Sequence, residues 1–249
     1  MVSRQRHAGR QIAALLLGCL CCFAATGAEL HVAAASNLNR ALAEICGAFE
    51  HQTGIHVVPT FGATAQLAQQ IENGAPFDVL MAADVEHVDE VIGKGAAASE
   101  SRTIYARGRL AIWAPARPEL KTLAGLADPS IRIVVIAKPE LAPYGAAAVE
   151  ALRNAGLWDK VRDKVVYAPS VSVAKQFADT GNGDAAFTAS SLIAGEKGNT
   201  FLVDEKLHKP IDQALCIVKA SKEQANARAF VRFLAGPEGK SILKRYGYL

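Results

Sequence analysis

Four short turns of small and hydroxyl-bearing residues are the part of this sequence best suited to chemistry. Each follows an apolar run and precedes an amphipathic segment, and the turns read Ala35-Ser36-Asn37, Gly62-Ala63-Thr64-Ala65, Ala142-Pro143-Tyr144-Gly145 and Pro169-Ser170-Val171-Ser172. A helix that begins at such a turn exposes backbone N–H groups and the positive end of its dipole. The hydroxyl side chains can add further donors, so the turns suit a bound anion.

None of these turns contains Lys or Arg. A cage built from neutral donors can only donate hydrogen bonds, so it favours a fully ionised oxyanion over one that carries a proton. Taken alone, each turn is better explained as an ordinary helix N-cap. The position of all of them at the carboxyl ends of predicted strands favours a shared site.

The elements that position these turns alternate along the chain. Apolar strands are predicted over residues 30–35, 55–61, 77–82, 131–137 and 165–167, and each is followed by an amphipathic helix or a helix start. Strands that alternate with helices predict an α/β fold whose mostly parallel sheets are covered by helices on both faces.

Two long extended stretches, residues 103–114 and 214–220, interrupt this alternation. They predict two lobes between which the chain crosses twice. We expect lobe 1 to comprise residues 29–108, completed by 211–249, and lobe 2 to comprise residues 109–210. A ligand cleft then lies between the lobes, where α/β proteins commonly bind small molecules.

The first 28 residues are predicted to be a cleaved signal peptide. Basic residues precede an uncharged apolar run over 12–25, and Thr26 and Ala28 fit the −3 and −1 positions of an export cleavage site. The run is about fourteen residues long, short of the roughly twenty that span a membrane. We therefore expect a periplasmic protein, with a retained anchor or lipidation at Cys19 as alternatives.

The formal net charge of +3 belongs to this leader. Removing residues 1–28 leaves 24 basic and 24 acidic residues, a net charge of zero. A neutral chain argues against nucleic acid or an anionic membrane as the partner. The chain without its leader keeps two cysteines, Cys46 and Cys216. They could form a disulfide in an oxidising compartment or remain ordinary buried thiols.

Several short motifs, in their order and spacing, resemble the periplasmic molybdate-binding proteins of ABC importers. The motifs are Ala33-Ala34-Ala35-Ser36-Asn37, Phe61-Gly62-Ala63-Thr64, Gly74-Ala75-Pro76-Phe77-Asp78-Val79 with Ala82-Ala83-Asp84, Ala142-Pro143-Tyr144-Gly145, and Lys244-Arg245-Tyr246-Gly247-Tyr248. The resemblance extends over residues 29–249. It implies the type II two-lobed periplasmic binding protein fold and a ligand that is molybdate or tungstate.

The resemblance also implies the ligand-binding residues. Ser36 matches the first hydroxyl ligand of that family, Asn37 beside it offers its N–H or its amide, and Thr64 stands where many members have Ser. Tyr144 and Val171 match positions that give backbone N–H groups, so their side chains need not touch the ion. No side chain is expected to bind the metal directly, and no cofactor is expected. The implied partner is an ABC permease in the inner membrane, and the implied receptor is a monomer.

Three other interpretations compete with this one, namely an enzyme, a receptor for another small anion, and a secreted scaffold or adhesion protein without a ligand. An enzyme would need a catalytic motif, but the sequence has no Gly-x-Ser-x-Gly elbow, Walker loop or His-Glu-x-x-His. A receptor for another small anion, such as sulfate or an organic acid, would share the fold. An organic carboxylate usually requires an Arg fork and aromatic walls, which the turns do not supply. We therefore expect a binding protein rather than an enzyme.

Overall fold

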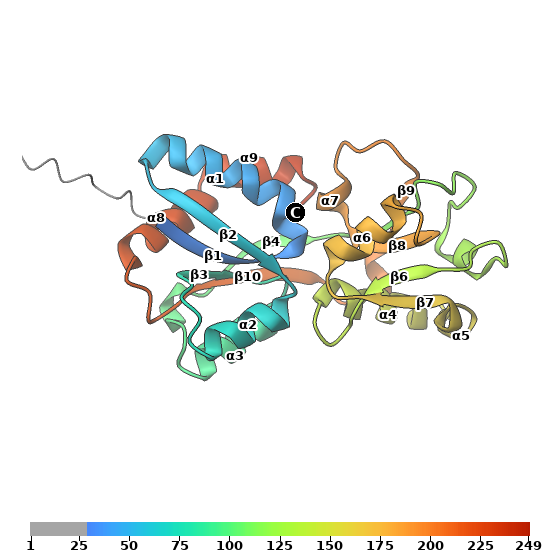
Figure 1. Ribbon diagram of the computed structural model, residues 1–249, viewed down its shortest axis with the longest axis horizontal. Coiled ribbons are helices and arrows are strands. Elements are labelled where there is room, and N and C mark those ends of the chain that lie inside the picture. Colours follow the sequence, from blue (N-terminus) through green and yellow to red (C-terminus); the bar gives the residue numbers. More distant parts are fainter. Residues whose placement is uncertain (1–28) are drawn as a thin grey trace, which may run out of the picture.

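The structure, a computed structural model, describes residues 29–249. The predicted signal peptide, its cleavage site and Cys19 lie outside the described residues. Figure 1 shows two lobes side by side, each a sheet with helices on both faces. In the part of the chain that the structure describes, no helix combines the length and apolar character needed to cross a membrane.

The first sheet has the strand order β2-β1-β3-β10-β4. Its strands are β1 (Glu29–Ala35), β2 (His56–Gly62), β3 (Val79–Met81), β4 (Thr103–Gly108) and β10 (Ile211–Ile217). β1 pairs in parallel with β2 and β3, whereas β10 runs antiparallel to both of its neighbours. Four of the five strands therefore point the same way, which confirms the mostly parallel character predicted from the sequence.

Helices cover both faces of the first sheet (Figure 1). One face carries the 3₁₀ turn η1 (Ser36–Leu38) with α1 (Asn39–Thr53), α8 (Gln224–Ala235) and α9 (Pro237–Arg245). The other face carries α2 (Thr64–Glu72) and α3 (Glu86–Gly93). α1 buries Leu42, Ile45 and Phe49 at helical spacing, as the sequence pattern predicts. Phe49 meets Phe230 of α8 edge to face, with ring centroids 5.3 Å apart.

The second sheet repeats this arrangement with the order β7-β6-β8-β5-β9. Its strands are β5 (Leu110–Trp113), β6 (Val134–Ala137), β7 (Val165–Ala168), β8 (Ala185–Ala189) and β9 (Thr200–Leu202). Here β5 is the single strand that runs against the others. The helices of this lobe are α4 (Pro143–Asn154), α5 (Trp158–Val161), α6 (Val171–Asp179) and α7 (Ser190–Ile193). Short 3₁₀ turns complete the chain, namely η2 (Ser99–Ser101), η3 (Leu123–Ala127), η4 (Arg162–Lys164) and η5 (Glu205–Leu207).

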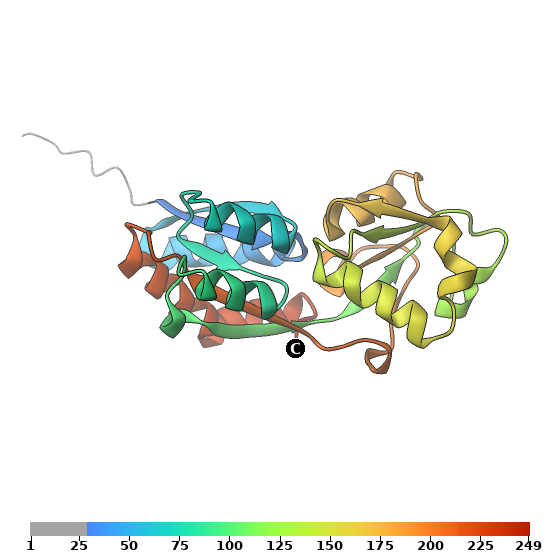
Figure 2. The same cartoon turned by 90° about the horizontal axis from the view of Figure 1, so that it is seen from below.

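The chain passes between the sheets at two places, which Figure 2 shows running along one side of the molecule. The extended stretch predicted over residues 103–114 is divided at Arg109, because β4 joins the first sheet and β5 the second. The return passage precedes β10, which begins at Ile211. These crossings agree with the two-lobed fold expected from the sequence.

The two cysteines of residues 29–249, Cys46 and Cys216, are buried free thiols. Cys46 packs with the helices on one face of the first sheet, and Cys216 packs on the other face. Burial raises the pKa of each thiol to about 12. Both therefore behave as small apolar core residues, the second of the two interpretations that the sequence left open.

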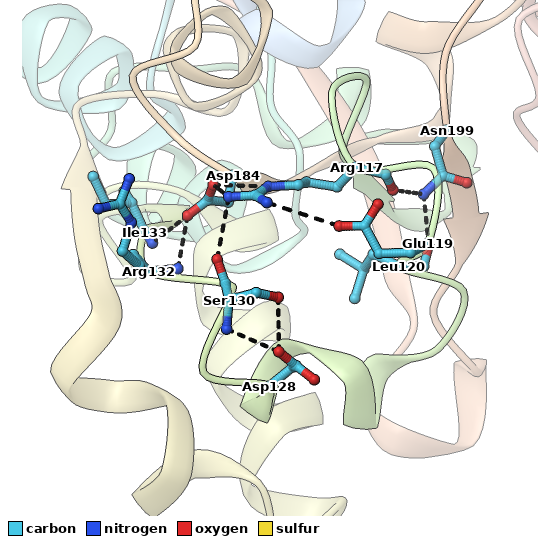
Figure 3. A network of polar contacts seen from close by, with 9 residues as sticks. All are labelled: Arg117, Glu119, Leu120, Asp128, Ser130, Arg132, Ile133, Asp184 and Asn199. Carbon is cyan, nitrogen blue, oxygen red and sulfur yellow. Dashed lines mark hydrogen bonds and ion pairs between the residues drawn. The ribbon is translucent and has the colours of Figure 1, made fainter.

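A polar network holds the loop between β5 and β6 against the second sheet (Figure 3). Asp184, just before β8, accepts hydrogen bonds from the backbone N–H groups of Arg132 and Ile133 at 2.7 and 2.9 Å. Its other carboxylate oxygen accepts from Arg117 Nε at 2.9 Å. Asn199 donates to the backbone carbonyl of Arg117 at 2.7 Å. One carboxylate thus fixes a long loop far from the turns that carry the predicted site.

Candidate oxyanion-binding site

Each predicted turn lies at the carboxyl end of a strand, where it opens a helix. β1 leads into η1 at Ser36, β2 into α2 at Thr64, β6 through a short loop into α4 at Pro143, and β7 into α6 at Val171. The predicted ligand residues are all buried, with 1 to 4% of their surface exposed: Ser36, Asn37, Thr64, Tyr144 and Val171. Parallel strands bring their carboxyl ends to one edge of each sheet, so each lobe presents two turns together.

The third turn owes its position to two residues beside Tyr144. Pro143 occupies the first turn of α4, where its missing N–H costs nothing and its fixed φ favours a helix. Gly145 packs so closely on β6 that an added Cβ would collide with the carbonyl oxygen of Ala137. The backbone of α4 can therefore lie directly against the end of β6.

Direct contacts between the lobes bring the turns of one lobe to those of the other. The backbone N–H of Ser172 in the fourth turn donates to the hydroxyl oxygen of Ser36 in the first, at 3.4 Å. The N–H of Ala65 in the second turn donates to the carbonyl of Leu141, just before the third, at 3.1 Å. The four turns therefore meet at one interface, as the sequence pattern predicts for a shared site.

Apolar packing and a groove mark the same interface. Ala35 and Ala83 of the first lobe belong to one buried cluster with Tyr144 and Val171 of the second. Beside the third turn, a groove of about 430 Å³ runs between the lobes. Its lining includes Ala83 and Asp84 from the first lobe, Ala142 and Pro143 from the second, and Ile211 at the crossing.

The hydroxyl oxygens of Thr64 and Ser36 each accept a hydrogen bond from a backbone N–H group. Thr64 Oγ1 accepts a hydrogen bond from the N–H of Ala83 at 3.1 Å, and Ser36 Oγ accepts the bond from Ser172. A hydroxyl has one hydrogen to donate and can accept separately through its lone pairs. Each of these side chains is thus fixed in place while its own hydrogen remains available for an acceptor.

Backbone donors are also available at all of the turns. Within residues 29–249, the N–H groups of Asn37, Thr64, Tyr144 and Val171 make no hydrogen bond to a protein atom. A buried N–H group without a partner is costly, and in folded proteins nearly all such groups are satisfied by protein, water or ligand. An oxyanion could satisfy these groups together, because each belongs to the first turn of a helix.

The side chains of Asn37 and Tyr144 are engaged elsewhere. Asn37 Nδ2 donates to Gln213 Oε1 and to the Tyr248 hydroxyl, both at 2.9 Å. The Tyr144 hydroxyl accepts from Gln213 Nε2 at 3.0 Å. Burial raises the pKa of the Tyr144 phenol well above its usual range, so the phenol stays neutral. Of the two donors that the sequence offered at Asn37, the geometry favours the backbone N–H over the amide.

Charged groups lie behind the turns rather than in them. Arg40, the second residue of α1, donates to the carbonyl oxygens of Leu192 and Ala194 across the interface, at 3.2 and 2.7 Å. Among residues 29–249, no three His, Cys, Asp or Glu side chains are grouped as they would be around a metal ion.

The sequence reasoning missed four polar residues that support the turns: the buried Ser191, Gln213 and Tyr248 and the half-buried Tyr105. Ser191 donates to the carbonyl of Asn37 at 2.8 Å, and so does the Tyr248 hydroxyl at 3.0 Å. Gln213 lies in β10 between Asp212 and the apolar stretch that begins at Ala214. Nothing in this local sequence distinguishes it from an ordinary polar residue at the start of a strand.

Comparison with known proteins places the chain in a family. The pattern of the bacterial extracellular solute-binding protein family matches residues 30–249. The molybdate-binding protein ModA of Rhodobacter capsulatus is 37% identical over 98% of this chain and 96% of its own length. ModA of Azotobacter vinelandii is also 37% identical, over 96% of each chain. A solved structure of the periplasmic molybdate-binding protein of Azotobacter vinelandii superposes with a TM-score of 0.85 at 34% identity, covering 88% of this chain and 98% of that one. These relatives are substrate-binding proteins of the two-lobed fold, and this chain belongs with them to the bacterial extracellular solute-binding protein family.

Proposed function

We propose that this protein is a periplasmic receptor that captures molybdate or tungstate and delivers it to an ABC importer. The observation that carries the proposal is the meeting of the four helix starts, which offer hydroxyls held in place and N–H groups without a partner among residues 29–249. Relatives named as molybdate-binding proteins share 37% of its sequence over nearly the whole chain. The proposed ligand residues are Ser36, Asn37, Thr64, Tyr144 and Val171.

Capture would work by closure of the lobes around the anion. Ser36, Asn37 and Thr64 belong to the first lobe, and Tyr144 and Val171 to the second. Only the closed arrangement lets both sets contact one ion, so the ligand stabilises that state selectively. The lobe boundaries that we propose, 29–108 with 211–249 and 109–210, are supported by the strands that each sheet contains.

Selectivity against sulfate would follow from the size of the cage. Donors fixed at the radius of molybdate or tungstate leave long, poorly aligned hydrogen bonds to a smaller tetrahedral ion. A hydrogen bond to a charged group contributes about 1.5 to 3 kcal/mol. Poor geometry in two of them would weaken binding about a hundredfold or more. A receptor for sulfate or an organic acid is the alternative that this argument disfavours.

The proposal also includes the compartment, the oligomeric state and the partner of the receptor. We place the mature protein in the periplasm as a monomer, after removal of residues 1–28, with an inner-membrane ABC permease as its partner. No cofactor takes part in capture, since the hydrogen-bond donors of the chain suffice to hold the ion. The anion is carried and released unchanged, so the protein performs no reaction on it.

Thermal unfolding with and without ligand tests the proposal. Molybdate or tungstate at about one hundred times its dissociation constant should add roughly 2.7 kcal/mol to the free energy of unfolding. For a chain of this size the melting temperature should rise by about 5 to 10 °C. Titration calorimetry of the same protein with molybdate, tungstate, sulfate and phosphate then ranks the ligands. A clear rise with sulfate or an organic acid, and none with molybdate or tungstate, would falsify the proposal.

A further inference from the structure

A single buried amide connects the turns of the two lobes. Gln213 lies on β10, close to the crossing between the sheets, and its side chain is fully buried. Its Oε1 accepts hydrogen bonds from Asn37 Nδ2 and from the Tyr105 hydroxyl, each at 2.9 Å. Its Nε2 donates to the Tyr144 hydroxyl at 3.0 Å. One side chain thus contacts the first turn of lobe 1 and the third turn, which belongs to lobe 2.

The hydrogen bonds around Asn37 fix its orientation. Both hydrogens of its amide are used, one by Gln213 and one by the Tyr248 hydroxyl. Its backbone carbonyl accepts from Tyr248 and from Ser191. The amide of Asn37 presents its nitrogen to Gln213 Oε1, whereas Asn37 Oδ1 is buried without a hydrogen-bond partner among the described residues. Asn37 is thereby held through its side chain and through the peptide that follows it, next to its own backbone N–H.

The bonds of Gln213 form a network with two arms, the first to Asn37 and the second to Tyr144. The second arm is held by packing. Gly108 ends β4, next to the crossing at Arg109. An added Cβ at Gly108 would collide with the Tyr144 hydroxyl and with Gln213 Nε2. The bond between Gln213 and Tyr144 therefore occupies the space that a side chain at this position would need. The end of β4 thus packs directly against the hydrogen bond that reaches the third turn.

We infer that Gln213 is a positioning residue for anion binding, which holds the backbone donors of Asn37 and Tyr144 at a fixed separation across the two lobes. The inference rests on the proposed function. Gln213 itself does not contact the ion. Its effect is on where the N–H groups point, and hydrogen bonds weaken steeply when donors are misaligned.

Substitutions at the two arms test this role. Gln213→Met keeps the length of the side chain and removes all of its hydrogen bonds, and we expect the dissociation constant for molybdate to rise about tenfold. Tyr144→Phe removes only the second arm, with an expected loss of about two- to fivefold. This changes the expectation from sequence, in which the Tyr144 side chain has no part in binding. Thr188→Val is the matched control, because Thr188 Oγ1 is buried without a partner among the described residues.

The measurement is titration calorimetry with molybdate and with sulfate, at a temperature where unfolding curves show every variant folded. A positioning role predicts that the ratio of the sulfate to the molybdate dissociation constant falls in Gln213→Met, which loss of stability alone would not change. It also predicts that the double variant Gln213→Met/Tyr144→Phe binds no more weakly than Gln213→Met. Thr188→Val should bind as the unaltered chain does.

The possible failures are distinguishable. If the unaltered chain binds molybdate tightly while Gln213→Met and Tyr144→Phe keep its affinity and its selectivity, the positioning role is overturned and the proposed function stands. If Gln213→Met does not fold, Tyr144→Phe decides by the same criteria. If the unaltered chain binds neither molybdate nor tungstate, the proposed function falls and the positioning role falls with it.

Discussion

At the scale of single residues, Thr64 shows how a neutral side chain can serve a dianion. Its Oγ1 accepts from the N–H of Ala83 at 3.1 Å, so its hydrogen is directed elsewhere. Thr64→Ala removes this donor, and we expect molybdate to bind about 10- to 100-fold more weakly, the range for one hydrogen bond to a charged group. Calorimetric titration of the folded variant measures the change.

Thr64→Ser is the control for this substitution. It keeps the hydroxyl and loses only a methyl group, so its affinity should stay within a few-fold of that of the unaltered chain. Equal losses in both variants would show that the methyl contact, rather than the hydroxyl, holds the site together.

The sequence could predict the donor turns because their chemistry is local. Ser36, Thr64 and the start of α4 at Pro143 each follow an apolar strand, and the pattern of strand, small residue and helix is visible in a few residues. The role of Gln213 could not be predicted in this way. The role of this glutamine depends on hydrogen-bond partners that lie 69 and 176 residues away in the chain. Only the folded structure brings these partners together.

At the scale of elements, Asp184 holds the loop between β5 and β6 (Figure 3). Burial would raise the pKa of this carboxyl, but hydrogen bonds from Arg117 and from the N–H groups of Ile133 and Arg132 lower it below its usual range. Asp184→Asn removes the charge, and we expect a loss of about 1 kcal/mol in the free energy of unfolding, because solvent screens part of the ion pair. Urea denaturation at pH 7 measures it.

The contribution of Asp184 to the free energy of unfolding should depend on pH. A carboxyl whose pKa is lowered by folding stabilises the protein fully above its unfolded pKa of about 3.9. That stabilisation disappears as the pH falls through the lower pKa of the folded state. The difference between the unaltered chain and Asp184→Asn should therefore shrink in acid. Asp163→Asn is the control, since the Asp163 side chain is 90% exposed and should show no such difference.

Elements were predictable where periodicity was strong, and less so where one apolar run serves two sheets. α1 and its buried face follow from helical spacing, and β1 from a short apolar run. The stretch over residues 103–114 reads as one strand, yet β4 and β5 separate at Arg109. Local β propensity is the same on both sides of that residue. Only pairing with β10 on one side and with β8 on the other distinguishes them.

At the scale of the whole molecule, Arg40 joins the two lobes beside the site. It donates to the carbonyls of Leu192 and Ala194 and lies 3.5 Å from Glu196. Arg40→Met keeps the apolar stem and removes these contacts, so the closed form should open more readily. We expect the dissociation rate of molybdate to rise about two- to fivefold, with little change in the association rate. Stopped-flow measurements of both rates test this expectation.

Arg232→Met provides the comparison for Arg40→Met. Arg232 is exposed in the last turn of α8, away from the interface, and its loss changes the net charge by the same amount. A similar change in the dissociation rate for both variants, or none for Arg40→Met, would show that the contacts of Arg40 do not keep the lobes closed. A change confined to the association rate would instead indicate long-range attraction of the anion.

The position of β10 in the first sheet also has a consequence for how the chain assembles. β10 lies between β3 and β4, yet it follows all the strands of the second sheet in the sequence. As the chain emerges during synthesis or export, β5 to β9 can pair as soon as residue 202 is present. β4 meets its described partner only after Ile211. The lobe that begins first is therefore finished last, and its two donor turns become part of a complete sheet only at the end of assembly.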